Sequence, residues 1–238
     1  MTPDELLARV LYRDGLMLIV DKPAGLPVHA GPKGGQNLED LFGHLCFGLP
    51  RPPALAHRLD RDTSGCLVLG RHAKALRRLG KLFSQGKIRK TYWAVVEGQP
   101  PESRGTIIAP LRKRNAQRGW WMEVHAEGQA AVTDYRVLAT AGGRSWLELH
   151  PRTGRTHQIR VHCVTLGCPV VGDPVYGRDP GAHQAEPLHL QARAIDVPLY
   201  PTREPVGAVA PPPPHMRAAL AALGWSGDGH AGSPAAVA

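Results

Sequence analysis

The chain has 238 residues and carries 29 lysines and arginines against 20 aspartates and glutamates, a net charge of +9. This positive balance predicts a polyanionic partner such as a nucleic acid. No apolar run reaches the roughly 18 residues of a membrane helix, and the acidic N-terminus lacks an apolar signal core, so we expect a cytoplasmic protein that neither spans a membrane nor is secreted. The four cysteines show no C-x-x-C spacing, which is typical of a reduced cytosolic chain rather than a disulfide framework.

The first half of the chain predicts short strands, loops and one long helix. The apolar run 16–20 indicates a buried strand, and Asn37 is placed to cap a short helix after a Gly-rich loop. The polar segment 57–65 ends in Ser-Gly, which indicates a loop, and the apolar run 66–69 follows it as a buried strand. Apolar side chains at helical spacing predict an amphipathic helix over residues 72–86 with one basic side.

The second half predicts a run of strands and two further helices. Strands are expected at residues 89–97, 120–124, 131–138, 144–150 and 188–197, and helices at 156–166 and 215–223. We expect the helix 156–166 to leave Arg160 on a different face from its inward residues, which are Ile159, His162, Cys163 and Leu166. Because strands come in runs with few strand–helix alternations, the sequence predicts an α+β fold with a mixed, largely antiparallel sheet. Residues 226–238 lack apolar periodicity, so we expect a folded unit over 1–225 and a disordered tail.

Two polar segments stand out as candidates for chemistry. Residues 57–65 (HRLDRDTSG) place carboxylates and guanidiniums in a loop directly before a buried strand, and loops on rigid scaffolds are where catalytic groups tend to lie. A solvated, salt-bridged turn is the alternative interpretation of such a charge cluster. Residues 153–162 (TGRTHQIRVH) form a second polar segment that leads into a predicted helix.

Together these segments resemble the RluA family of pseudouridine synthases, whose motifs read H-R-L-D-x-x-T-S-G and T-G-R-T-H-Q-I-R-V-H. Three other parts of the chain fit family signatures in the same order. They are residues 20–29, which match D-K-P-x-G-x-x-V-H; residues 90–94, which match K-x-Y-x-A; and residues 172–177 together with 188–190. The resemblance extends from about residue 12 to about residue 224, and five matches in the right order are far more specific than one.

The resemblance implies an enzyme that isomerises a specific uridine of rRNA or tRNA to pseudouridine without a cofactor. It implies the pseudouridine synthase fold, in which a mixed sheet bends around a central catalytic cleft with helices and loops at its sides; no RNA-binding S4 module is expected. Asp60 matches the catalytic aspartate, and Arg160 the arginine that pairs with it. Tyr92 matches the tyrosine that stacks on the target base, and Arg58 the residue that enters the RNA stack as the nucleotide leaves. Whether the carboxylate attacks C1′, attacks C6 or removes a sugar proton stays open.

Physical arguments support parts of this assignment. A carboxylate in a water-poor pocket needs a neighbouring cation, which a paired arginine supplies. Asp60 follows Leu59, whose side chain can anchor the loop in the core, whereas Asp62 is better placed to bond the amides of the turn that follows. Tyr92, as a lone strand tyrosine, has core packing as its alternative role. We expect His57 to orient the loop as a hydrogen-bond donor.

Two other functional classes remain as alternatives. One is a catalytically silent RNA-binding or ribosome-assembly factor on the same fold, and the other is a metal-dependent nuclease. The imidazoles and the thiol near the motifs show no recognised zinc spacing, so no metal site is expected; these residues are His57, His157, His162 and Cys163. Basic clusters at residues 71–90 and 112–118 predict phosphate contacts. We expect a monomer with RNA as its partner, no obligatory protein partner and no membrane association.

Overall fold

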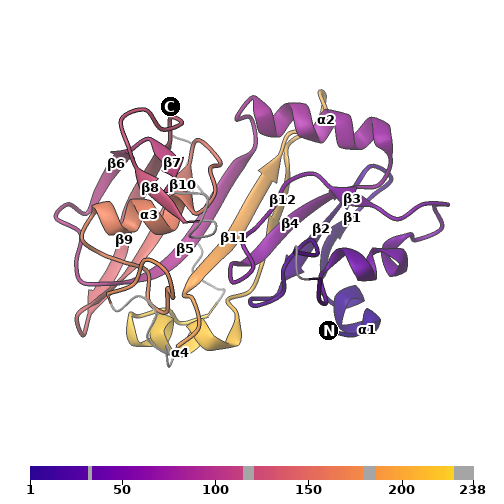
Figure 1. Cartoon of the computed structure of the whole chain (residues 1–238). Coiled ribbons are helices and arrows are strands. Elements are labelled where there is room, and N and C mark those ends of the chain that lie inside the picture. The colour runs from indigo at the N-terminus through magenta and orange to yellow at the C-terminus, as the bar shows by residue number, and fades with distance from the viewer. Residues whose placement is uncertain (32–33, 115–120, 179–185, 228–238) are drawn as a thin grey trace.

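A computed structural model describes residues 1–31, 34–114, 121–178 and 186–227, and its centre is a ten-stranded mixed sheet (Figure 1). Along the main path the strands are β1 (Val10–Arg13), β2 (Met17–Lys22), β4 (Ser64–Gly70), β11 (Leu190–Val197), β5 (Arg89–Glu97), β10 (Arg144–Pro151), β9 (Val132–Ala141) and β6 (Arg104–Ile108). Two further strands lie off this path: β3 (Ala54–Leu55) pairs with β4, and β12 (Val206–Val209) pairs with β11. A separate two-stranded ladder joins β7 (Leu111–Lys113) to β8 (Met122–Val124).

Strand directions confirm the predicted α+β fold with its mixed, largely antiparallel sheet. Among the described strands, β4 and β11 form a parallel pair, in which Ser64 lies opposite Gln191 and Gly65 opposite Ala192. The other ladders of the described chain are antiparallel. The parallel pair joins the end of the charged loop 57–65 directly to the middle of the sheet.

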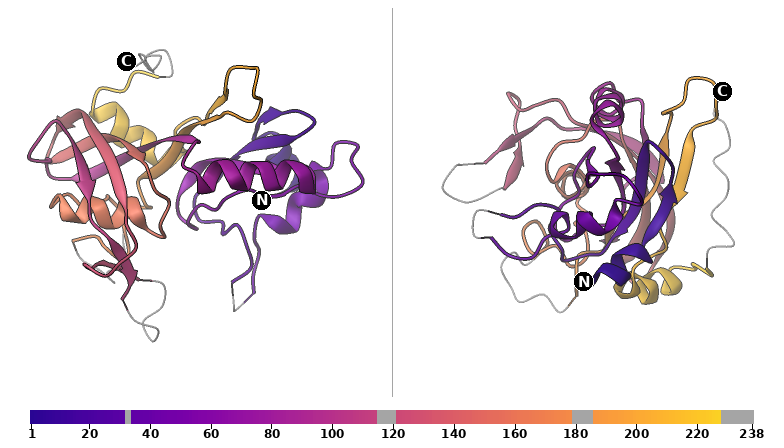
Figure 2. Two further views of the ribbon diagram at one scale, coloured as in Figure 1. Left: turned by 90° about the horizontal axis from the view of Figure 1, so that it is seen from above. Right: turned by 90° about the vertical axis from the view of Figure 1, so that its right-hand side faces the viewer.

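Helices lie on both faces of the sheet (Figures 1 and 2). They are α1 (Pro3–Leu7), the 3₁₀ helix η1 (Glu39–Leu45), α2 (Ala73–Ser84), α3 (Gln158–Thr165) and α4 (Pro214–Ala222). On β5, Trp93 and Val95 face α4, whereas Ala94 and Val96 face α3. At the other end of the sheet, alternate residues of β2 and β4 face α2 on one side and η1 with α1 on the other. This alternation follows the two-residue period of a strand. No helix of the described residues is long and apolar enough to cross a membrane.

Two local predictions differ from the structure. Asn37 does not cap η1, because its side chain bonds Asp40 and the residue before η1 is Leu38, which forms no side-chain cap. The helix predicted from residue 156 begins at Gln158, because His157 has a left-handed backbone. Arg160 is buried together with its neighbours, since α3 is enclosed from Gln158 to Cys163. Trp120, where a strand was expected to begin, and residues 228–238 of the expected tail lie outside the described residues.

Two hydrophobic cores meet beside β5. Leu59 belongs to the core that α1 and η1 form with β2 and β4, and Ile159 belongs to the core that α3 forms with β5 and β10. Tyr92 packs against both cores. The residues that follow these two anchors along the chain are Asp60 and Arg160, so the packing of the cores brings the two polar motifs together.

Candidate active site

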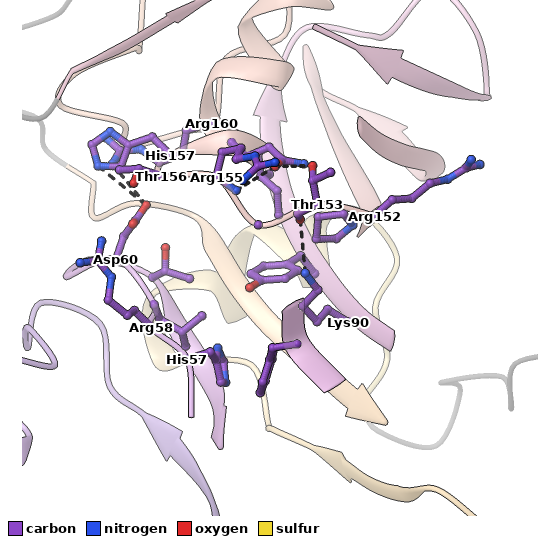
Figure 3. Close-up of a pocket in the computed structure, with 18 of the residues that line it drawn as sticks. His57, Arg58, Asp60, Lys90, Arg152, Thr153, Arg155, Thr156, His157 and Arg160 are labelled. Atoms are coloured by element: carbon purple, nitrogen blue, oxygen red, sulfur yellow. Dashed lines mark hydrogen bonds and ion pairs between the residues drawn. The ribbon is translucent and has the colours of Figure 1, made fainter. Parts of the chain in front are cut away.

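The two polar motifs line one cavity of about 560 Å³ (Figure 3). Its walls come from the loop before β4, the C-terminal end of α2, the start of β5 and the segment that leads into α3. The four residues that the sequence singled out for the site all lie on this cavity; they are Arg58, Asp60, Tyr92 and Arg160.

The loop that carries Asp60 is held at both ends by buried groups. Leu59 is only 6% exposed, and burying such a side chain contributes about 2 kcal/mol. Gly65, at the other end, has φ +104°, and a β-carbon there would lie 2.2 Å from the carbonyl oxygen of Ala192. Only glycine allows this backbone conformation and this close approach of β4 to β11.

Lys22 ties the same loop to the start of the chain. Its side chain is fully buried, and Nζ donates to the carbonyl oxygens of Pro23, Leu26 and Arg61, each at 2.8 Å. Burial lowers the pKa of Lys22 to about 7, against the opposing charges of Asp62 and Asp60. Three acceptors match the three N–H groups of an ammonium, so this contact favours the charged form. Lys22 lies in the segment 20–29 that matches a family signature, but no role was predicted for it from the sequence.

Asp60 faces two nitrogen donors across the cavity (Figure 3). Its Oδ2 lies 3.8 Å from Nη1 of Arg160 and 3.9 Å from Nε2 of His157, and the carboxylate side chain is 26% exposed. The expected juxtaposition of Asp60 and Arg160 is therefore present, at the long end of the ion-pair range. His157 was not singled out as a neighbour of Asp60, because nothing in its spacing distinguishes it from a histidine of the helix.

Asp173 is the closer partner of Arg160. Nε and Nη2 of the guanidinium donate to the Asp173 carboxylate at 2.7 and 2.6 Å, and this carboxylate also accepts from the amides of Val175 and Tyr176. Burial acts to raise the pKa of Asp173, but the hydrogen bonds and the charge of Arg160, together with the two backbone amides, lower it overall. Gly172 has φ +74° and a β-carbon would lie 2.1 Å from the carbonyl oxygen of Pro187, so glycine is needed where the chain turns into Asp173.

Tyr92 and Arg58 differ in how far their side chains are buried and held by neighbouring residues. Tyr92 is half-buried between the two cores, and burial, followed by the charge of Asp60, raises the pKa of its hydroxyl. It both packs in the core and lines the cavity, so the two interpretations of this tyrosine are compatible. Arg58 is exposed beside Asp60, and it forms no ion pair within the described residues (Figure 3). A guanidinium in this position is available to a ligand.

His57 bonds both the loop and β4. Its hydrogen bond with the main chain of Arg58 raises its pKa, as a bond donated by the ring does, which agrees with its expected role as a donor to the loop. Its Nε2 accepts the main-chain N–H of Val68 at 3.0 Å, and its ring stacks on Phe83 with centroids 4.5 Å apart. Burial, with a smaller effect of the Lys90 charge, lowers the pKa of His57 to about 3. The ring is therefore neutral and links the loop 57–65 to β4.

The remaining motif residues do not converge on a metal. His162 bonds Thr133 and the carbonyl oxygen of Ala109, away from His57 and His157. Within the described ranges no group of three or more His, Cys, Asp or Glu side chains could hold a metal ion. Asp62 was expected to bond the amides of the turn, but among the described residues its side chain only approaches Nε of Arg61, at 3.9 Å.

The helix α2, whose C-terminal end reaches the cavity, carries exposed basic side chains. Lys74, Arg77 and Arg78 are exposed on this helix, whose last turn contributes Phe83 and Ser84 to the cavity wall. In the second basic cluster, Arg112 and Arg114 of the β7 region share Glu123 at 2.9 and 3.8 Å, which offsets part of their charge. Arg118 lies outside the described residues.

Comparison with known proteins assigns the family. The family model for RNA pseudouridylate synthases matches residues 16–165. An uncharacterized RNA pseudouridine synthase of Zymomonas mobilis is 45% identical over 213 residues, which cover 87% of this chain and 95% of that protein. Ribosomal large subunit pseudouridine synthase D of the same organism is 35% identical over 81% of this chain and 64% of its own length.

A solved structure has the same architecture. Human RNA pseudouridylate synthase domain containing 4 superposes with a TM-score of 0.79 at 28% identity, covering 93% of this chain and 95% of the human one. The chain therefore belongs to the RluA-type family of RNA pseudouridine synthases.

Proposed function

We propose that this RNA pseudouridine synthase uses Asp60 as its catalytic carboxylate on a uridine that is flipped into the 560 Å³ cavity. The observation that supports this most is the position of Asp60, a partly exposed carboxylate beside the buried guanidinium of Arg160. The cavity volume lies within the roughly 300–1,000 Å³ that small-molecule pockets span. The substrate is an rRNA or tRNA, and the similarity to a relative named for the large ribosomal subunit makes its rRNA the first candidate.

The reaction requires no net addition of atoms or electrons. The N1–C1′ bond breaks, the base rotates, a C5–C1′ bond forms, the C5 proton leaves to solvent and N1 gains a proton. A carboxylate can assist glycosidic cleavage either as a nucleophile or as a base. Asp173 holds Arg160 in place, so a fixed positive charge lies beside the reacting carboxylate throughout.

Tyr92 would contact the flipped base, and Arg58 would fill the gap that the base leaves in the RNA stack. The ring of Tyr92 stacks on the flipped uracil at the cavity wall, while Arg58, free of intramolecular ion pairs in the described chain, reaches into the RNA. Extruding a base costs a few kcal/mol, and an inserted guanidinium offsets part of this by stacking.

Asp60→Asn and Asp62→Asn test the assignment as a matched pair. Both amides keep the size of the side chain and remove its charge. We expect Asp60→Asn to abolish tritium release from RNA transcribed with 5-tritiated uridine, while RNA affinity stays within about threefold. Asp62→Asn should keep measurable turnover, since Asp62 makes only a long contact with Arg61. Substantial single-turnover activity in Asp60→Asn, or complete loss in a well-folded Asp62→Asn, would overturn the assignment.

We also propose that the enzyme acts in the cytoplasm as a monomer, without a cofactor, a metal ion or an obligatory protein partner, and that residues 1–225 form the catalytic unit. The continuous sheet from β1 to β6 supports a single unit. Light scattering on the pure protein should give the mass of one 25.7 kDa chain, and turnover should be unchanged in excess chelator. A dimer mass, or a loss of turnover that divalent ions restore without refolding the RNA, would contradict this.

A further inference from the structure

His157 has a backbone conformation that the helix after it does not explain. With φ 52° and ψ 18° it is left-handed, and Phe47 is the other described non-glycine residue with positive φ. Such a conformation costs about 1–3 kcal/mol. The side chain forms no helix cap that would account for it. Its ring instead lies beside the cavity, with Nε2 3.9 Å from Oδ2 of Asp60 (Figure 3).

Hydrogen bonds at Tyr176 determine which nitrogen of His157 carries the proton. The main-chain N–H of Met122 donates to Oη of Tyr176 at 2.7 Å, and Nδ1 of His157 lies 2.8 Å from the same oxygen. Among the described residues no other acceptor receives the single hydroxyl proton of Tyr176, so this proton points at Nδ1. The opposite arrangement would leave that half-buried proton unpaired, at about 1–3 kcal/mol. The neutral ring therefore carries its hydrogen on Nε2, the nitrogen that faces Asp60.

Charged groups surround this ring on several sides. Asp60 and Asp62 face it from the loop before β4, Arg160 from α3, and Asp173 from the turn that also carries Tyr176. Burial lowers the pKa of His157, and this effect exceeds the opposing influence of Asp60. A neutral donor next to a carboxylate is thus the state that the surroundings favour at neutral pH.

We propose that His157 is a positioning residue for the isomerisation: in the RNA complex its Nε2–H donates to Oδ2 of Asp60 and, together with Nη1 of Arg160, holds that oxygen so that Oδ1 faces the uridine. The inference rests on the proposed catalytic function of Asp60. Both donors lie 3.8–3.9 Å from Oδ2 in the free protein, so a movement of about 1 Å brings each into hydrogen-bond range. Contacts of this kind commonly tighten when substrate binds.

Substitution by asparagine or by glutamine tests the roles of the two ring nitrogens of His157 one at a time. The polar end of asparagine lies where Nδ1 is, so His157→Asn keeps an acceptor for Tyr176 but loses the donor to Asp60. Glutamine extends to the position of Nε2, so His157→Gln restores a donor to Asp60. Asparagine also tolerates the left-handed backbone better than glutamine. The two variants therefore reverse the order expected of a purely structural residue: His157→Asn should be the more stable and the slower.

The test measures single-turnover tritium release and RNA affinity, using large-subunit rRNA and tRNA transcribed with 5-tritiated uridine. We expect His157→Asn to slow the reaction about 10- to 100-fold with affinity within about threefold, because misplacing a reacting group by an ångström has effects of this size. His157→Gln should recover at least about fivefold of that loss despite its lower melting temperature. His157→Asn at the wild-type rate, or faster than His157→Gln, would overturn the inference.

A spectroscopic measurement checks the tautomer without any turnover. Proton–nitrogen correlation spectra of histidine-labelled protein, with the His157 signals assigned by their loss in His157→Asn, should show the hydrogen on Nε2. Tyr176→Phe should shift the ring towards a mixture of tautomers. A hydrogen on Nδ1 in the wild-type protein would overturn the inference. If Asp60→Asn retains turnover, the proposed function itself fails; if Asp60→Asn is inactive and His157→Asn is not slowed, only the role of His157 fails.

Discussion

Arg160 contacts two carboxylates, and the two contacts are unequal. It forms a bidentate pair with the fully buried Asp173 at 2.6–2.7 Å and a longer contact with Asp60 at 3.8 Å. The pair with Asp173 fixes the guanidinium, while the contact with Asp60 leaves that carboxylate free to rearrange around a substrate. One arginine thus joins a structural carboxylate to the one proposed to react.

Removing the charge of Asp173 should damage both folding and turnover. Asp173→Asn leaves the buried guanidinium of Arg160 without its close counter-ion, and breaking such a buried pair costs about 3–5 kcal/mol. Denaturant unfolding should report this loss. Asp134→Asn is the matched control, because its bidentate pair with Arg152 is exposed and contributes little. Equal stability of the two variants would show that Arg160 does not depend on Asp173.

His57 should make stability sensitive to acid. Its pKa is near 6.5 when unfolded and about 3 when folded, so between these values the unfolded chain binds a proton that the folded protein does not. The stabilisation is complete above pH 6.5 and declines as the pH falls towards 3. His57→Gln keeps an acceptor for Val68 but cannot titrate. Between pH 7 and pH 4.5 it should lose about 2 kcal/mol less than wild type.

Unfolding free energies across this pH range measure the effect. The exposed His44→Gln is the control and should follow the wild-type pH dependence. Parallel curves for His57→Gln and wild type would contradict a neutral ring at His57.

The sequence identified the site residues that belong to recognisable motifs, and it missed their long-range partners. Asp60 and Arg160 were expected to meet, and they do. Asp173 lies in a segment that matches a family signature, but the sequence did not show that it pairs with Arg160. A buried arginine indicates that an acidic side chain lies nearby, and it does not indicate which one. Likewise, no local pattern shows that Lys22 binds the carbonyl oxygen of Arg61, since that contact depends on the sheet bringing the two segments together.

At the scale of elements, apolar periodicity predicted the helices and strands whose bounds depend on packing. It missed a helix boundary that depends on the backbone of a single residue. The helix α2 and the strand β5 lie close to their predicted bounds, because apolar side chains repeat at the right intervals. The start of α3 was placed too early, because the left-handed backbone of His157 has no signature in the sequence.

The helix α2 should contribute to the electrostatic footprint of RNA binding. It carries exposed basic residues, and its C-terminal end reaches the cavity. Each phosphate neutralised adds close to one unit to the salt dependence of binding. In the double variant Lys74→Ala with Arg78→Ala, the slope of log affinity against log salt should fall by about one to two units. Arg112→Ala with Arg114→Ala should change it less, since Glu123 already offsets part of their charge.

Filter binding across a series of salt concentrations gives these slopes. A wild-type affinity that does not depend on salt would contradict a phosphate-dominated interface. An unchanged slope in the α2 variant would mean that the RNA lies on another surface.

At the scale of the whole molecule, the class of the fold was predictable and its connectivity was not. Runs of strands indicated an α+β fold, and the ten-stranded mixed sheet confirms it. The strand order could not be derived, because the parallel pairing of β4 with β11 joins segments more than a hundred residues apart in the chain. That pairing places the loop of Asp60 beside β5 and opposite α3, and so it creates the site.

Pseudouridine mapping of total RNA tests most directly that the chain isomerises uridine in RNA through Asp60. The comparison uses cells that lack the gene and the same cells that express either the wild-type protein or Asp60→Asn at equal levels. We predict that one or a few uridines lose the modification without the gene, regain it with the wild-type protein and stay unmodified with Asp60→Asn. An unchanged map in the cells that lack the gene, or full restoration by Asp60→Asn, would contradict the account.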